Sequence, residues 1–156
     1  MTLDAIDYAI LVILQSEGRI TNAELASRIG LTPGPVLARV NKLEASGLIQ
    51  GYTAVLDRER LGFPVTVFVA VIVKSHDQPT CDSFVRAVNE LDEVLECHHI
   101  AGDEDYLLKV VAQSPADYER FTTEKLATIP SIQRIKTTFV LSSSKSTSRI
   151  PLESRK

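Results

Sequence analysis

Residues 20–48 read I-T-N-A-E-L-A-S-R-I-G-L-T-P-G-P-V-L-A-R-V-N-K-L-E-A-S-G-L, and these residues predict how the first third of the chain folds. Thr21 and Glu24 have the spacing of a capping box, which marks the start of a helix. Gly30 is a typical residue for the end of that helix, because glycine adopts the left-handed backbone conformation at little cost.

A second helix is predicted directly after this turn. Thr32 can cap it, Pro33 occupies a first-turn position where a missing N–H costs nothing, and Gly47 closes it. Two short helices joined this tightly are typical of a helix-turn-helix. A third helix is expected over residues 3–17, and the three helices are expected to share one core. Its predicted members are Leu3, Ile10, Leu25, Ile29, Val40 and Leu43.

The second helix of the pair is expected to have two unlike faces. Val36, Val40 and Leu43 fall on one side at helical spacing, and small or polar residues fall on the other. Small residues allow close approach to the major groove, while Asn, Arg and Lys can reach base edges and phosphates. A solvated helix face carries the same residue types, so the spacing alone leaves both interpretations open. The outward residues are Gly34, Pro35, Ala38, Asn41 and Lys42, with Arg39 on the flank.

Net charge gives no support for nucleic-acid binding. The chain has a formal charge of −3, and residues 1–60 carry six Lys and Arg against seven Asp and Glu. Specific DNA binding would therefore depend on a local basic stripe of Arg28, Arg39 and Lys42, and on more than one copy of the module acting together.

Cysteine usage and hydropathy suggest a cytoplasmic protein. Cys81 and Cys97 lack a C-x-x-C arrangement, and no signal peptide precedes them, so free thiols in a reducing compartment are expected. No apolar run reaches the roughly 18 residues that a membrane span requires. A soluble, cytoplasmic protein without a membrane partner is the expectation.

A second domain is predicted beyond a linker. A strand is expected within residues 48–57 and a polar linker over 57–64. From residue 65 the pattern follows the order βαββαβ, which is the ferredoxin-like sandwich of a four-stranded antiparallel sheet with two helices on one face. The strands are predicted at 65–73, 94–100, 106–112 and 132–141, and the helices at 79–91 and 115–128.

The predicted fold class is therefore α+β. It combines a helix-turn-helix (winged-helix-like) domain at 1–50, a strand and linker at 51–64, an αβ-sandwich at 65–142 and a tail at 143–156. The tail is Ser-rich and basic, which is typical of a flexible segment, although residues 149–152 retain enough apolar character to lie extended on a neighbour.

The first sandwich strand predicts a homodimer. Residues 65–73 are apolar at both alternating sets of positions, so both faces of the sheet should be buried. The chain has no further helices with which to cover the second face, and the same sheet of a second copy is the simplest cover. A dimer would also bring together two copies of the predicted DNA-contacting helix, as a two-fold symmetric operator requires.

Candidate chemistry in the second domain is sparse. His98 and His99 would point to opposite faces of a strand, so they cannot both bind one metal ion without other ligands. The turn at 102–106 carries three consecutive carboxylates, which are usually solvated, although beside exposed N–H groups they can hold a free amino acid. No catalytic triad or phosphate-binding loop is present, and neither a catalytic activity nor a cofactor is expected.

Several longer matches extend over nearly the whole chain. They are D-x-x-D from Asp4, G-R-I-T-N-A-E-L-A from Gly18, G-L-T-P-x-P from Gly30, R-V-x-K-L-E from Arg39, G-L-I-Q-G-Y-T-A from Gly47, E-C-H from Glu96 and G-D-x-D-Y-L-L-K from Gly102. With these motifs the chain resembles the Lrp/AsnC, or feast/famine, transcription regulators, and it is most similar to their leucine-responsive branch.

The resemblance implies dimers that gather into tetramers or octamers on double-stranded DNA, with leucine or another small amino acid bound where dimers meet. It places Thr32, Pro33, Pro35, Arg39 and Lys42 in the DNA reader. It places His99, Ile100, Gly102, Asp103, Asp105, Thr138 and Phe139 near the effector, with Asp105 as the partner of the ligand ammonium.

Two other functions remain open from the residues alone. One is a ligand-sensing or partner-binding module that does not bind DNA, which is consistent with the acidic charge balance. The other is a metalloenzyme that uses His98 or His99. Steep weakening with salt is diagnostic of DNA binding through phosphates, and bound metal is diagnostic of the enzyme.

Overall fold

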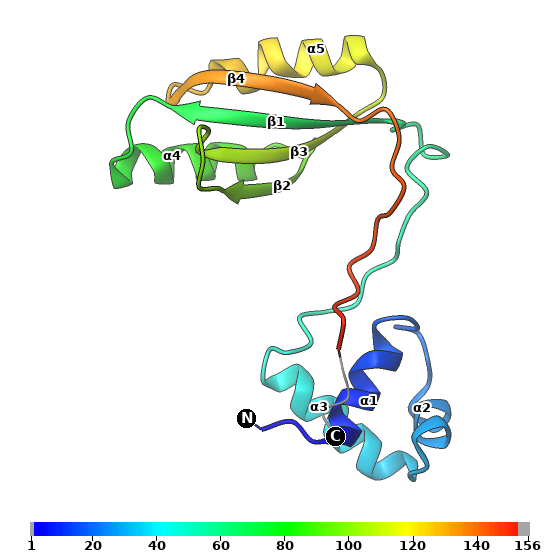
Figure 1. The fold of residues 1–156 in the computed structure, drawn as a ribbon. Helices are drawn as coiled ribbons and strands as arrows, with labels where there is room; N and C mark the ends of the chain where they lie inside the picture. The colour runs from blue at the N-terminus through cyan, green and yellow to red at the C-terminus, as the bar shows by residue number, and fades with distance from the viewer. Residues whose placement is uncertain (1, 153–156) are drawn as a thin grey trace. The chain divides into compact units, whose positions relative to one another are not determined.

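The computed structural model describes residues 2–152, which form two compact units (Figure 1). The first unit contains the chain up to Val55 together with the C-terminal segment from Lys145. The second unit contains Leu56–Ser144.

The first unit is the predicted three-helix module. It consists of α1 (Ala5–Leu14), α2 (Asn22–Ile29) and α3 (Pro33–Ala45). Gly30 has a φ of 72° and ends α2 in the left-handed conformation, as predicted. The predicted core is confirmed, with Leu3 and Ile29 at its partly buried edge. Its buried members are Ile10, Leu25, Ala26, Val36, Val40 and Leu43.

One predicted cap is absent and another is only half formed. Thr32 precedes α3, but its side chain makes no capping hydrogen bond, because the third helical position is Pro35, which has no N–H to donate. Thr21 does cap α2 and accepts from Glu24 N at 3.2 Å. The return bond of the capping box is replaced, because the Glu24 carboxylate pairs with Arg28 instead.

The strand predicted within residues 48–57 is wrong for the single chain. Residues 50–57 have no regular secondary structure, and among the described residues no strand pairs with them. A strand needs a neighbour for its main-chain hydrogen bonds, and one copy of the chain offers none here. The polar stretch after it forms a hydrogen-bonded turn, in which Phe63 N donates to Arg58 O at 2.8 Å.

The second unit confirms the predicted βαββαβ order. Its sheet has the order β2-β3-β1-β4, and every pairing is antiparallel. A short 3-10 helix, η1 (Leu126–Thr128), follows the second α-helix. The other elements are β1 (Val65–Val73), α4 (Gln78–Asn89), β2 (Val94–His99), β3 (Tyr106–Ala112), α5 (Pro115–Glu124) and β4 (Ile132–Phe139).

The two faces of this sheet differ. Alternate β1 residues from Val67 to Val73 are buried in one core with Phe84 of α4 and Phe121 of α5, so both helices cover the same face. The other face presents Phe68 and its alternate neighbours, which are only half-buried. No helix within residues 2–152 is long and apolar enough to cross a bilayer.

Candidate functional site

The outer face of α3 is small and largely uncharged. Pro33 fixes the first turn, and burial of Val36, Val40 and Leu43 against α1 and α2 orients the opposite face outward. A helix with short side chains near its start can approach a groove closely. The exposed residues on and around this face are Thr32, Pro33, Gly34, Pro35, Ala38, Asn41 and Lys42.

Arg39, on the flank of this face, is held by two carboxylates of the α1 N-terminus. Its Nη1 donates to Asp4 Oδ2 and to Asp7 Oδ1, both at 2.7 Å, and its side chain is 30% exposed. These two bonds raise the pKa of Arg39, and they help to lower the pKa of Asp4, for which the hydrogen bond from Asp7 N is the larger cause. The sequence did not predict this pairing.

A second arginine of the predicted basic stripe is also paired. Arg28 donates to both carboxylate oxygens of Glu17, at 2.5 and 2.9 Å, and to Glu24 at 2.7 Å. Lys42 takes part in no ion pair among the described residues. Of the predicted stripe, therefore, only Lys42 offers a positive charge without a carboxylate partner in this part of the chain.

Asp105 is built into the turn between β2 and β3. Its main chain bonds to Val71 O and to Ile100 N, each at 2.9 Å. Its carboxylate accepts from Val73 N at 2.9 Å through Oδ2 and contacts His76 Nε2 at 2.7 Å through Oδ1. The Val73 bond is the main cause of the lowered pKa of Asp105, and His76 adds to it. His76 was missed by the sequence analysis, because it lies on a different loop.

The other predicted effector residues of this turn lie close by. His99 stacks on Tyr106 with the ring centroids 4.8 Å apart, and Ile100 is bonded to Asp105 as described above. Gly102 and Asp103 are exposed in the turn. The structure thus gathers five predicted effector residues at one end of the sheet.

Thr138 and Phe139 do not join this group within one chain. Thr138 pairs with Phe68, whereas Tyr106 at the end of the turn pairs with Val71, further along β1. Thr138 is separated from the turn by two strand spacings across the sheet and by the stretch of β1 from Phe68 to Val71, which together amount to about 15 Å. Thr138 and Phe139 also point to opposite faces, since the Phe139 ring meets Tyr118 on the helix-covered side at 5.3 Å.

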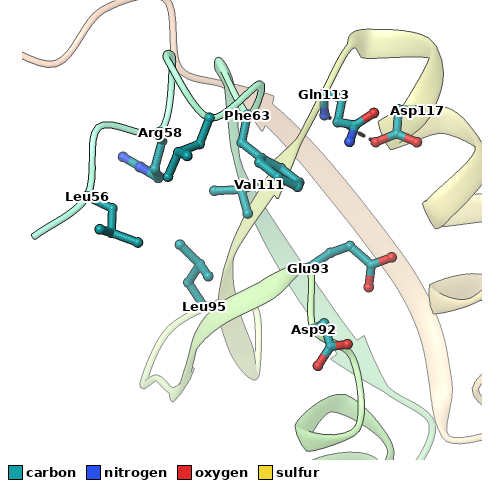
Figure 2. A pocket seen from close by; sticks show the side chains of 10 residues that line it. Leu56, Arg58, Phe63, Asp92, Glu93, Leu95, Val111, Gln113 and Asp117 are labelled. Carbon is teal, nitrogen blue, oxygen red and sulfur yellow. Dashed lines mark hydrogen bonds between the residues drawn. The ribbon is translucent and has the colours of Figure 1, made fainter. Parts of the chain in front are cut away.

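A cavity of about 690 Å³ lies at the less covered side of the sheet (Figure 2). Leu56, Phe63, Leu95 and Val111 form its apolar walls, and Val111 is only 7% exposed. Polar residues border it, with Arg58 from the turn before β1 and the carboxylates Asp92, Glu93 and Asp117 from the sandwich. The sequence analysis did not identify this cavity.

The two histidines that were considered as metal ligands lie on opposite faces of β2. His98 contacts Glu96 Oε2 at 3.1 Å on the side away from the helices, and His99 lies on Tyr106. Within residues 2–152, no group of three His, Cys, Asp or Glu side chains is arranged to hold a metal ion.

A helix-turn-helix followed by an αβ-sandwich that carries a candidate ligand site is the architecture of a DNA-binding regulator with a ligand-binding domain. Residues 3–50 match the family described as winged helix-turn-helix DNA-binding, and residues 66–150 match the Lrp/AsnC ligand binding domain. The chain belongs to the Lrp/AsnC family of transcriptional regulators, which are not enzymes.

Relatives match over almost the full chain. The leucine-responsive regulatory protein of Escherichia coli is 39% identical over 153 residues, which cover 98% of this chain and 93% of that protein. A transcriptional regulator from Neisseria meningitidis, solved as its L-Met complex, superposes with a TM-score of 0.93 at 33% identity over 97% of both chains. An AsnC family regulator from Agrobacterium tumefaciens gives a TM-score of 0.91 at 35% identity, covering 96% of this chain and 97% of that one.

Proposed function

We propose that this regulator binds a free amino acid in a site assembled from two copies of the chain, and that occupancy changes assembly and DNA affinity. The separation of Thr138 from the Asp105 turn supports this most directly. If both groups line one ligand, residues of different copies must complete the site. The L-Met complex of the Neisseria regulator favours an amino acid as the ligand class.

The turn has the chemistry to hold an α-amino acid. Asp105 Oδ1 contacts His76, whose side chain is 73% exposed, so a ligand ammonium can take the place of the imidazole. Among the described residues, the N–H groups of Gly102 and Asp103 donate to no other main-chain group, which leaves them available to a ligand carboxylate. Asp105 Oδ2 keeps its hydrogen bond from Val73 N when the ammonium replaces the imidazole at Oδ1.

We assign the less covered sheet face to a second copy of the chain. Phe68 and Val111 lie on it, and Leu95 at its edge is 48% exposed. A partly exposed apolar face on an antiparallel sheet favours packing against the same face of a second copy.

A two-fold dimer contains two copies of α3, and we assign DNA binding in the cytoplasm to the outer face of α3. The proposed contact residues are Thr32, Pro33, Gly34, Pro35, Ala38, Asn41 and Lys42.

A ligand screen combined with a mass measurement tests the proposal. The full chain is heated in the presence of each of the twenty free amino acids, beginning with L-leucine and L-methionine. Any amino acid that raises the unfolding temperature is then added during light scattering and during titration with a DNA duplex. We expect one amino acid, or a small related group, to change both particle mass and DNA affinity.

The screen can also reject the amino-acid effector. A protein that binds DNA normally but shows no thermal shift and no mass change with any of the twenty would contradict it. In Asp105→Asn the amide keeps the Val73 hydrogen bond and loses only the charge that an ammonium requires. If an amino acid raises the unfolding temperature of this variant as much as that of the wild type, the turn is not part of the ligand site.

A further inference from the structure

A closed set of hydrogen bonds joins α3 to the first turn of α1. Asp4 and Asp7 cap this turn reciprocally, with Asp7 N donating to Asp4 Oδ1 at 2.9 Å and Asp4 N donating to Asp7 Oδ2 at 3.1 Å. The remaining oxygen of each carboxylate accepts from the same nitrogen of Arg39, at 2.7 Å in both cases. All four carboxylate oxygens are therefore occupied, and within residues 2–152 Arg39 is the one side chain that donates to them from another helix.

The burial of these groups shows why Arg39 is fixed. The Asp7 side chain is 12% exposed, so removal of its cationic partner would leave a poorly hydrated negative charge. Both bonds are made by Nη1, so they direct the side chain toward the first turn of α1, and a phosphate could meet only Nη2 and Nε of the guanidinium. Lys42, three positions further along the same helix, is exposed and is held by no carboxylate among the described residues.

We infer that Arg39 is a positioning residue of the DNA reader: it acts through Asp4 and Asp7, and it sets how α3 presents its outer face without touching DNA itself. From the sequence, Arg39 was expected to contact a base or a phosphate directly. The positioning role rests on DNA binding through α3, and the control below separates failure of that assignment from failure of the role of Arg39.

The test compares Arg39→Met, which keeps the aliphatic stem, with Lys42→Met on the same helix. The probe is a fluorescent duplex selected by the wild-type protein from a random-sequence library, and affinity is measured over a series of salt concentrations. We expect Arg39→Met to lower the unfolding temperature and to weaken binding on the order of tenfold, with the salt dependence unchanged. Lys42→Met should keep the unfolding temperature and reduce the salt slope by about one.

A variant of the two carboxylates separates positioning from direct contact. Asp4→Asn, Asp7→Asn keeps Arg39 and the helix cap but removes both charged partners of the guanidinium. If Arg39 acts through Asp4 and Asp7, this variant should weaken binding about as much as Arg39→Met. A direct contact made by Arg39 would survive in this variant, so undiminished DNA affinity overturns the inference.

Two other outcomes also overturn it. A salt slope that falls by about one in Arg39→Met, at an unchanged unfolding temperature, would make Arg39 a phosphate contact. Wild-type affinity of Arg39→Met at about 10 °C, where all variants are folded, would reduce Arg39 to a stability residue. A normal salt slope in Lys42→Met would overturn the reader face itself, and the positioning role with it.

Discussion

Gln15 and Ile150, 135 positions apart, are joined by two hydrogen bonds between a side-chain amide and the main chain. Gln15 Nε2 donates to Ile150 O at 3.2 Å, and Gln15 Oε1 accepts from Ile150 N at 2.6 Å. The chain thus returns after β4 to contact the end of α1. Residues 149–152 were predicted to lie extended on a neighbour, and here Ile150 contacts its own chain.

Replacement of Gln15 should release this C-terminal contact. In Gln15→Met the amide is lost and the side-chain length is kept, so the Ile150 N–H loses its acceptor. Because both groups are exposed, we expect a stability change below about 1 kcal/mol. Hydrogen exchange at Ile150 should accelerate by about tenfold or more. Exchange at Ile150 as slow as in the wild type would show that the amide does not hold the segment.

Two glycines of the first unit should respond oppositely to the same change. Gly30 has a φ of 72°, so Gly30→Ala places a side chain in the left-handed region and should destabilise the protein by about 1 kcal/mol. Gly34 lies inside α3, and a Cβ added there would meet nothing within 4 Å, so Gly34→Ala should stabilise by about 0.5–1 kcal/mol. Urea unfolding measures both, and equal effects would contradict the assigned backbone roles.

Asp105 should stabilise the sandwich in a pH-dependent way. Its pKa is lowered from 3.8 in the folded protein, so its stabilising effect is complete above that value and is lost as the pH falls through the folded-state pKa. At pH ~7 Asp105→Ala should cost about 1–3 kcal/mol, because it orphans the Val73 N–H, and Asp105→Asn should cost less.

Urea unfolding curves at neutral and at strongly acidic pH measure this effect. The difference between wild type and Asp105→Asn should shrink toward zero at acidic pH, since the carboxyl is then protonated in both the folded and the unfolded state. A difference that stays constant over the whole range would show that the charge of Asp105 does not contribute to stability.

The less covered sheet face should control dimer formation. Phe68 is opposite Lys109 and Thr138 on the neighbouring strands, so Phe68→Lys places a charge in the middle of the proposed interface. We expect the dimer dissociation constant to rise on the order of a hundredfold in sedimentation experiments. Glu119→Lys, on the exposed side of α5, is the matched control and should sediment as the wild type. Equal particle mass for the two variants would exclude this face.

The fold was predictable because its signals are local. The continuous apolar run of β1 and the glycine at position 30 act over a few neighbours, and the strand and the helix end that they predict both appear in the structure. Thr32 shows the limit of such rules, because a favourable cap residue fails when Pro35 removes its donor. The residues around 50–57 were expected to form a strand, but a strand also depends on a partner that one chain lacks.

The candidate sites depend on contacts that sequence spacing does not encode. Arg39 is 32 positions from Asp7, and His76 is 29 positions from Asp105. In each case residues on separate elements meet only after folding. The D-x-x-D motif at Asp4 was used in the sequence only as part of the resemblance, and its function as an acceptor for Arg39 requires the packing of α1 against α3.

A subunit-mixing experiment tests the two-copy amino-acid site most directly. Asp105→Asn removes the charge from the turn, and Thr138→Trp blocks the β4 side, so neither variant alone should bind the amino acid found in the screen. After the two are unfolded together and refolded, a site shared between copies is intact in about one quarter of cases. Calorimetry should then recover about that fraction of wild-type sites, at wild-type affinity. No recovery in a mixture shown to contain hybrid particles would contradict the account, because both residues would then belong to a site within one chain.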